Sequence, residues 1–180
     1  MENKLQDQWQ FIKKNPFFEI MQSQDIWVRN QIRVNPCKQH QKPEGWVFEN
    51  FLHLCLMTTS NILLKKELFN EFGYYDETLT CCEDYDLALK MARYKPIGLD
   101  QKEGFVRYQG HQDQLSKKYE AMDQFRVQSL AALLEKEKQE SYRELIRSVL
   151  EKKLAILMNG AKKRNLIEKV NFYQEILSRI

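Results

Sequence analysis

The stretch LFNEFGYYDETLTCCEDYDLALK, residues 68–90, decides the fold of this chain. It predicts a short helix over Lys65–Phe72 that ends at Gly73, because glycine readily adopts the left-handed conformation of a helix cap. It also predicts a second helix over Glu83–Tyr94, since apolar residues recur there at helical spacing. The side chains expected to face inward are Leu87, Met91 and Tyr94.

Upstream of this stretch, the pattern predicts a mixture of helix and strand. Residues 3–14 are predicted to form a helix, with Leu5, Trp9 and Ile12 on one face. Two extended runs follow, at Phe17–Met21 and Ile26–Val34, and residues 54–64 are predicted to form a buried strand.

Downstream, short strands are predicted at Ile97–Leu99 and Phe105–Tyr108. From Ser116 onward the pattern becomes wholly helical, with Gly160 separating the last two helices. We therefore expect an α/β domain over residues 1–115 and a helical extension over 116–180. The three helices of the extension are expected at 116–136, 140–158 and 162–178.

The composition limits the class of protein. The 180 residues carry a net charge of only +3, so a nucleic-acid partner is not expected. The N-terminus has no apolar signal-peptide core, and no stretch approaches the roughly 20 apolar residues that span a bilayer. The four cysteines have no metal or redox spacing. We expect reduced thiols and a cytoplasmic protein.

Acidic residues gather at the start of the second predicted helix. Acids in a first helical turn are stabilised by the helix dipole by about 0.3–1 kcal/mol each. A well-capped helix, with Asp76 or Glu83 as the cap, explains the cluster without chemistry. A carboxylate fixed at a helix start also suits a general base. The cluster comprises Asp76, Glu77, Glu83, Asp84 and Asp86.

The combination of motifs resembles the inverting glycosyltransferases of family two, which have the GT-A fold. Members of that family contain lFdevGgFDE, then cEDYDLWLR, and later GGHaDQLS. This chain has the corresponding residues 68–90 and then QGHQDQLS at 109–116. Further similar segments are WVRN at 27–30, RVNP at 33–36 and HQKPEGW at 40–46. The resemblance covers roughly residues 1–135.

The resemblance implies the C-terminal half of a GT-A, Rossmann-like nucleotide-diphospho-sugar transferase fold. The implied reaction transfers a sugar from a nucleotide-diphospho-sugar to an acceptor hydroxyl with inversion. Asp84 matches the family's general base, and Glu83 matches its neighbour in the acceptor site. His111 matches the histidine that helps to hold a divalent metal, Mg²⁺ or Mn²⁺, on the diphosphate.

The family's other metal-binding signature, D-x-D, has only a false counterpart here. Asp84-Tyr85-Asp86 has that spacing, but residues two apart on a helix point about 200° apart and cannot converge on one ion. In the family the true D-x-D lies in the nucleotide-binding half, before a helix similar to residues 3–14. We therefore expect that this chain alone neither holds the metal nor binds nucleotide sugar.

A polar loop is predicted over residues 35–45, which contain two prolines and a glycine. Cations pair with phosphate and aromatic faces pack on sugar rings, so residues in and near the loop are candidates for acceptor binding. A solvated loop anchored by one buried tryptophan is an equally good reading. The expected acceptor-binding residues are Arg33, Lys42, Trp46 and Asp86.

Two functional hypotheses stay open at this point. The chain is either part of a metal-dependent glycosyltransferase, or a non-catalytic remnant or subunit that pairs with a separate donor-binding half. In the second case the shortened sheet is expected to expose an edge through which copies self-associate. Lys162-Lys163-Arg164 would provide at most a weak peripheral contact with a membrane.

Overall fold

The computed structural model describes residues 2–110, 119 and 121–180. The predicted α/β class is confirmed, because helices surround a small mixed sheet. The helices and strands are α1 (Lys4–Lys14), β1 (Ile20–Arg29), β2 (Ile32–Val34), α2 (Phe48–His53), β3 (Ile62–Leu64), α3 (Leu68–Phe72), α4 (Glu83–Ala92), β4 (Ile97–Gln109), α6 (Asp123–Lys136), α7 (Glu140–Lys163) and α8 (Ile167–Ser178).

β1 is the central strand of the sheet. β4 pairs with it in parallel along its whole length, whereas β3 and β2 pair antiparallel with its beginning and its end. The β1–β4 register shifts on either side of Gln24, and such bulges re-aim side chains and are common next to functional sites. β4 is one continuous strand, so the prediction of two short strands in this region was wrong.

The predicted strand Ile26–Val34 is a hairpin. Asn30 and Gln31 both have positive φ, at 51° and 64°, as a two-residue turn that joins twisted strands requires. β1 therefore begins at Ile20, within the first predicted run, and continues to the turn. Alternation of side chains alone gave no sign of this reversal, because no glycine marks the turn.

The predicted buried strand over 54–64 was also wrong in most of its length. Only β3, its last three residues, is a strand, and a short 3-10 turn, Thr59–Asn61, precedes it. The residues before that turn, 54–58, form an irregular segment that follows the end of α2 at His53. The physical reason is Asn61, whose side chain is fully buried and bonds to β1 instead of continuing a ladder.

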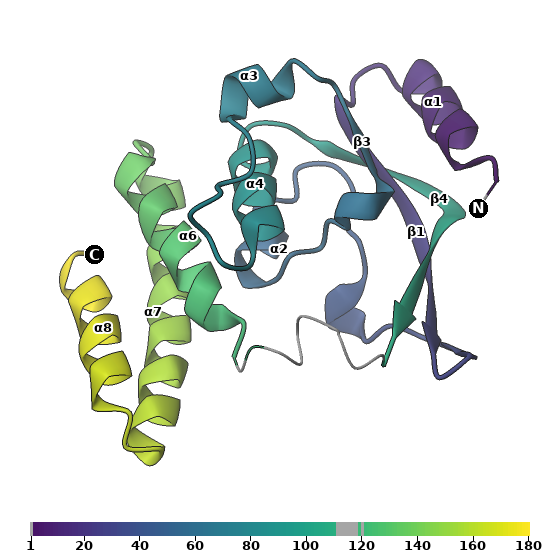
Figure 1. Cartoon of the computed structure of the whole chain (residues 1–180). Helices are drawn as coiled ribbons and strands as arrows, with labels where there is room; N and C mark the ends of the chain where they lie inside the picture. The colour runs from purple at the N-terminus through teal and green to yellow at the C-terminus, as the bar shows by residue number, and fades with distance from the viewer. Residues whose placement is uncertain (1, 111–118, 120) are drawn as a thin grey trace.

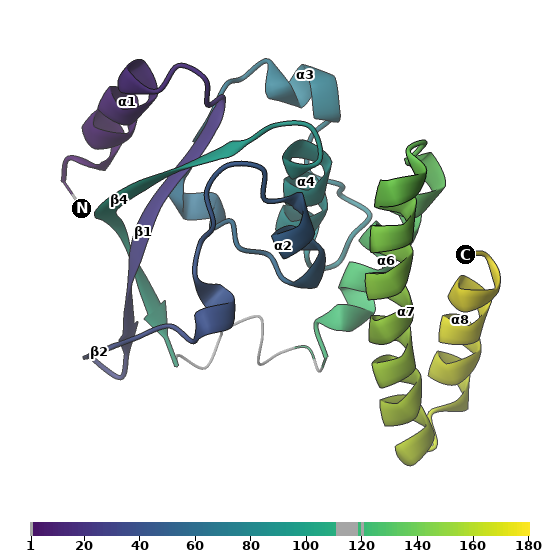
Figure 2. The same cartoon turned by 180° about the vertical axis from the view of Figure 1, so that it is seen from behind.

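The sheet is covered on both faces (Figures 1 and 2). α1 packs on one face against β1 and β4, while α2 and α4 lie on the other, between the sheet and the helices α6 and α7. Gly98 allows the close approach of α1, because a Cβ there would lie 2.8 Å from the Phe11 ring. On α1 itself, however, Leu5 is 70% exposed and Trp9 57% exposed.

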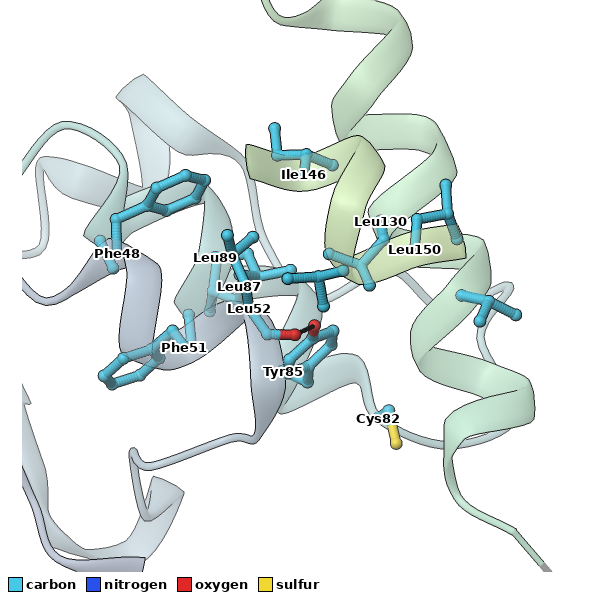
Figure 3. Close-up of a cluster of buried hydrophobic side chains, with 14 of the residues drawn as sticks. Phe48, Phe51, Leu52, Cys82, Tyr85, Leu87, Leu89, Leu130, Ile146 and Leu150 are labelled. Atoms are coloured by element: carbon cyan, nitrogen blue, oxygen red, sulfur yellow. Dashed lines mark hydrogen bonds between the residues drawn. The ribbon is translucent and has the colours of Figure 1, made fainter. Parts of the chain in front are cut away.

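α4 forms the centre of the hydrophobic core (Figure 3). Leu87 and Met91 are fully buried as predicted, and the Tyr85 hydroxyl donates a 2.8 Å hydrogen bond to the Leu52 carbonyl of α2. Tyr94 does not face inward: it follows the helix, is 52% exposed and stacks on Phe72. Gly73, after α3, has the expected positive φ of 84°, but its ψ of 178° is extended rather than left-handed helical.

The last three helices pack side by side, α6 on α7 and α7 on α8 (Figure 1). α7 runs through Gly160, so the predicted break at that glycine was wrong. The chain turns instead after Arg164, where Asn165 has a φ of 55°. Within the described ranges, no helix is both long enough and apolar enough to cross a bilayer.

Candidate functional site

The start of α4 places two carboxyl groups in a cleft. Cys82, the residue before the helix, has a left-handed φ of 67°, which turns the chain sharply into its first turn. Glu83 and Asp84 then line a cleft of about 840 Å³, hereafter the acid cleft. Its opposite walls come from the segment 57–60, from β4 and from α6, which contribute Thr58, Arg107 and Arg126.

Asp84 lies in an environment that disfavours its charged form. Burial raises the pKa of its carboxyl group above the ordinary value, and the neighbouring Glu83 acts in the same direction. The backbone N–H of Tyr85, which donates a 2.7 Å hydrogen bond to Asp84 Oδ1, partly offsets this rise. Such a carboxylate is a stronger base than one in water, as a group that accepts a proton from a hydroxyl should be.

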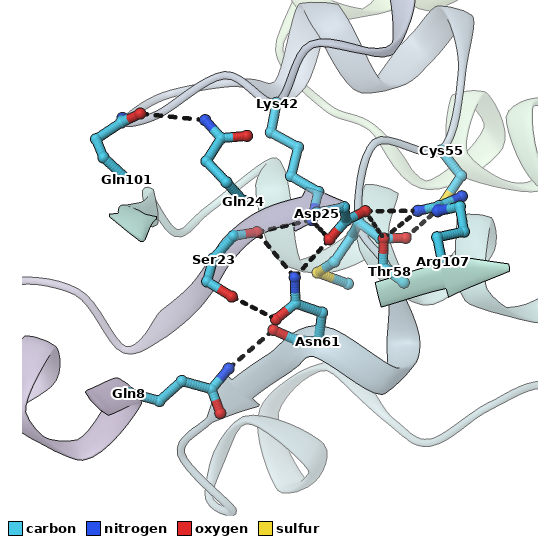
Figure 4. A network of polar contacts seen from close by, with 11 residues as sticks. Gln8, Ser23, Gln24, Asp25, Lys42, Cys55, Thr58, Asn61, Gln101 and Arg107 are labelled. Carbon is cyan, nitrogen blue, oxygen red and sulfur yellow. Dashed lines mark hydrogen bonds and ion pairs between the residues drawn. The ribbon is translucent and has the colours of Figure 1, made fainter. Parts of the chain in front are cut away.

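A buried polar network supports one wall of the acid cleft (Figure 4). Its centre is Asp25, which follows the bulge in β1 and has a side chain that is only 2% exposed. One of its oxygens accepts hydrogen bonds from Lys42 and Asn61. The other accepts from Thr58 and Arg107, at 3.2 and 3.0 Å. The network therefore fixes the cleft-lining guanidinium of Arg107 to the sheet.

A second hollow of about 470 Å³ adjoins the acid cleft. Trp27, His40, Cys55 and Arg107 line both, so the two form one continuous depression. The Arg107 guanidinium lies 4.9 Å from the centre of the Trp27 ring, and the centre of the His40 ring lies 5.3 Å from the same point. Burial, then Arg107 and Arg126, lower the pKa of His40, so its imidazole is neutral at pH 7.

The far wall of the acid cleft carries a similar cluster of charges. Arg126, at the start of α6, donates a 3.0 Å hydrogen bond to Asp123. Lys153 of α7 also pairs with Asp123, at 2.8 Å, and donates to the His53 carbonyl. These contacts hold Arg126 against the Tyr85 ring, 5.7 Å from its centre. Two separate helices thus fix the position of this arginine.

The predicted site residues divide into two groups. Glu83 and Asp84 line the acid cleft, and Lys42 lines the adjoining hollow as part of the Asp25 network. Arg33 pairs with Glu103 on the surface, and Trp46 is 67% exposed; neither lines the cleft.

Asp86 and His111 complete the predicted set. Asp86 is 5% exposed and pairs with Lys90 one turn along α4, away from Asp84, as its position two residues on requires. His111 lies outside the described residues.

Sequence reasoning missed the residues that shape the cleft: Asp25, Arg107 and Arg126. No pattern marked Asp25 as buried, because it lies between the two predicted extended runs and follows the polar residues 22–24. The arginines offered no signal either, because arginine is common on exposed strands and helices. Only the pairing of β1 with β4 brings Asp25 and Arg107 together across 82 positions of sequence.

Among the described residues, no group of three or more His, Cys, Asp or Glu side chains is arranged to hold a metal ion. No protein-family model matches the chain, and neither a curated protein nor a solved structure matches it significantly. A functional assignment rests on the quoted motifs and on the geometry of the cleft.

Proposed function

We propose that this chain carries the acceptor-side portion of an inverting, GT-A type glycosyltransferase. The observation that carries the proposal is the position of Asp84. Its carboxyl group has a raised pKa, belongs to the first turn of α4 and lines a cleft of about 840 Å³. A cleft of that volume accommodates a small saccharide. The motif that matches the family's base and the half-buried, cleft-lining carboxylate coincide at the same residue.

In the proposed reaction, the Asp84 carboxylate accepts the proton of an acceptor hydroxyl. The hydroxyl oxygen then attacks the anomeric carbon of the donor sugar from the face opposite the leaving nucleoside diphosphate, which inverts the configuration. Glu83, adjacent in the cleft, contacts the acceptor and raises the basicity of Asp84 through its charge. The divalent metal and the donor site belong to the complete enzyme, and the residues described here are not assigned to them.

The test is a transfer assay on the complete enzyme, in which this chain is present together with the donor-binding half. Nucleoside diphosphate release is measured from a panel of nucleotide sugars, with a glycan extract as the acceptor source. Asp84→Asn should lower the rate by about 10²–10⁴-fold, since that is the contribution of a general base. Asp86→Asn serves as the matched control, because Asp86 points away from the cleft. An Asp84→Asn protein that transfers at the wild-type rate, or a product with retained configuration, would overturn the proposal.

A second candidate function is a subunit that pairs with a separate donor-binding half. The observation in its favour is an apolar surface on and after α1, where Leu5, Trp9 and Phe17 are 70%, 57% and 66% exposed. Size-exclusion chromatography with light scattering should then detect self-association of the chain. The double substitution Leu5→Gln/Trp9→Gln should abolish it. A monomer with one sharp thermal transition, unchanged by these substitutions, would count against it.

A further inference from the structure

The two arginines of the acid cleft carry more positive charge than their partners balance. Arg107 shares Asp25 with Lys42, and Arg126 shares Asp123 with Lys153. In each cluster two cations share one carboxylate, so one positive charge is left over. Both clusters sit behind the same cleft, one on the sheet side and one on the helical side.

The guanidinium groups also keep unused hydrogen-bond donors. Both side-chain contacts of Arg107 run through Nη2, and the contact of Arg126 with Asp123 runs through Nη1. The Nε atom of each is buried and has no acceptor among the described residues. Neither arginine forms an ion pair with Glu83 or Asp84 in the described part of the chain. The remaining Nη atom of each guanidinium (Nη1 of Arg107, Nη2 of Arg126), and not the buried Nε, is the donor available to a carboxylate or a phosphoryl group in the cleft.

The surroundings favour a charged sugar as the ligand. Trp27 lies under Arg107 and offers an aromatic face at the junction of the cleft and the hollow. The neutral imidazole of His40 provides a further polar contact beside the two arginines. The arginine cations, the aromatic face of Trp27 and the neutral imidazole of His40 together suit a sugar ring that carries an anionic substituent.

We propose that the acid cleft binds an anionic group of the acceptor saccharide, a carboxylate or a phosphoryl group, between Arg107 and Arg126. This assignment rests on the proposed function, because a molecule held in this cleft is the one whose hydroxyl faces Asp84. The acids at the start of α4 then hold the reacting end of the acceptor, and the arginines hold its charged end. The acceptor is accordingly an acidic or phosphorylated sugar and not a neutral one.

The experiment is an NMR titration of the full chain with glucuronate, glucose 6-phosphate, glucose and UDP. The indole signal of Trp27, assigned with Trp27→Phe, reports binding in the cleft. We expect one or both of the acidic sugars to bind at least tenfold more tightly than glucose, and UDP to bind less tightly than that sugar. Arg107→Gln and Arg126→Gln should each weaken binding of the acidic sugar by about 10-fold or more, the loss of one charge-assisted contact. Arg107→Lys should keep part of the affinity for the acidic sugar, because it keeps the positive charge.

Arg179→Gln is the matched control, since Arg179 is an exposed arginine that pairs with Glu175 at the end of the chain. Equal affinity for glucose and both acidic sugars, or unchanged affinity in both arginine variants, would overturn the inference. Tighter binding of UDP would do so as well, because the anion would then belong to the donor.

Asp84→Asn separates this inference from the proposed function. That substitution should leave binding of the acidic sugar intact or strengthen it, because it removes a negative charge from the cleft. If Asp84→Asn abolishes transfer while the arginine variants bind normally, the function stands and the anion site falls. If the arginine variants lose binding while Asp84→Asn transfers normally, the anion site stands and the role of Asp84 as base falls.

Discussion

Asp25 has a buried carboxylate and Asp84 a half-buried one, and their surroundings differ in kind. Asp25 accepts hydrogen bonds from four side chains, two of them cationic, so its charge is fully compensated. Asp84 has one backbone donor and lies near a second acid, and its pKa is raised. The first arrangement suits a structural role, and the second suits a group that exchanges protons.

Asp84→Asn is expected to stabilise the fold at neutral pH by about 1 kcal/mol, because it removes a charge that burial disfavours. The pKa of Asp84 in the folded state lies above the unfolded value, so its protonation stabilises the fold. That stabilisation is complete below the unfolded pKa and is lost as the pH rises through the folded pKa. Urea unfolding of both proteins should thus show a difference at about pH 7 that shrinks toward about pH 4. A destabilised variant at neutral pH would contradict this account.

Asp25→Asn should destabilise the protein by about 3–5 kcal/mol, because it leaves the buried ammonium of Lys42 without a counter-charge. Glu19→Gln is the matched control: Glu19 also pairs with two lysines, but at the surface, and should cost less than about 1 kcal/mol. Denaturant titrations of the two variants measure the contrast. Similar losses of stability in the two variants would show that burial of the Asp25 network does not determine the cost of removing its charge.

At the scale of elements, glycines have opposite roles in β4 and α7. Gly104 of β4 lies against the network, where an added Cβ would be 2.2 Å from Ser23 Oγ. Gly160 of α7 lies within a helix, where the nearest atom to an added Cβ is 3.4 Å away at the end of the Arg164 side chain. The same substitution at the two positions therefore separates crowding from helix propensity.

Gly104→Ala should destabilise the protein by about 1–3 kcal/mol, because Ser23 or the strand must move to make room. Gly160→Ala should stabilise it by about 0.5–1 kcal/mol, since alanine restricts the unfolded chain and favours helix. Thermal melts followed by circular dichroism measure both changes. A gain from Gly104→Ala would mean that β4 does not approach β1 as closely as described.

At the scale of the whole molecule, one hydrophobic cluster extends from α2 and α4 through α6 to α7 and Tyr173 of α8. The part-buried ion pair of Lys153 with Asp123, and the hydrogen bond from Lys153 to the His53 carbonyl, also tie α7 to α6 and α2. The helices after residue 122 therefore share a core with the α/β part, and the two should unfold together.

Leu150→Ala tests this cooperativity. Leu150 of α7 is fully buried, so the substitution should cost about 2–5 kcal/mol. All three tryptophans lie in the first 46 residues, and their fluorescence reports the α/β part alone. The fluorescence midpoint should shift by the same amount as the helical signal. Ile156→Ala, at a position that is 68% exposed on the same helix, should shift neither. A fluorescence midpoint that stays in place in Leu150→Ala would show that the parts unfold independently.

The sequence by itself determined the local features of this protein. Helical periodicity, with capping and stop residues, located α1, α3 and α4 to within a few residues, because these signals act over one or two turns. The acids at positions 83 and 84 were visible for the same reason. Helical periodicity also predicted that three helices end the chain, but it misplaced the start of α6 and the boundary between α7 and α8. Local patterns failed where a long-range contact decides the backbone, as at Asn61, which bonds to β1. They also failed at the turn of Asn30 and Gln31, because no glycine marks it.

Only the tertiary structure decided the composition of the cleft. The pairing of β1 with β4 places Asp25 beside Arg107, and the packing of α6 on α4 places Arg126 opposite. The burial of Asp84, and with it the direction of its pKa shift, depends on those neighbours and on no residue type taken alone. A sequence pattern specifies which side chains are present and how they repeat, whereas solvent exclusion and charge compensation arise only when distant segments meet.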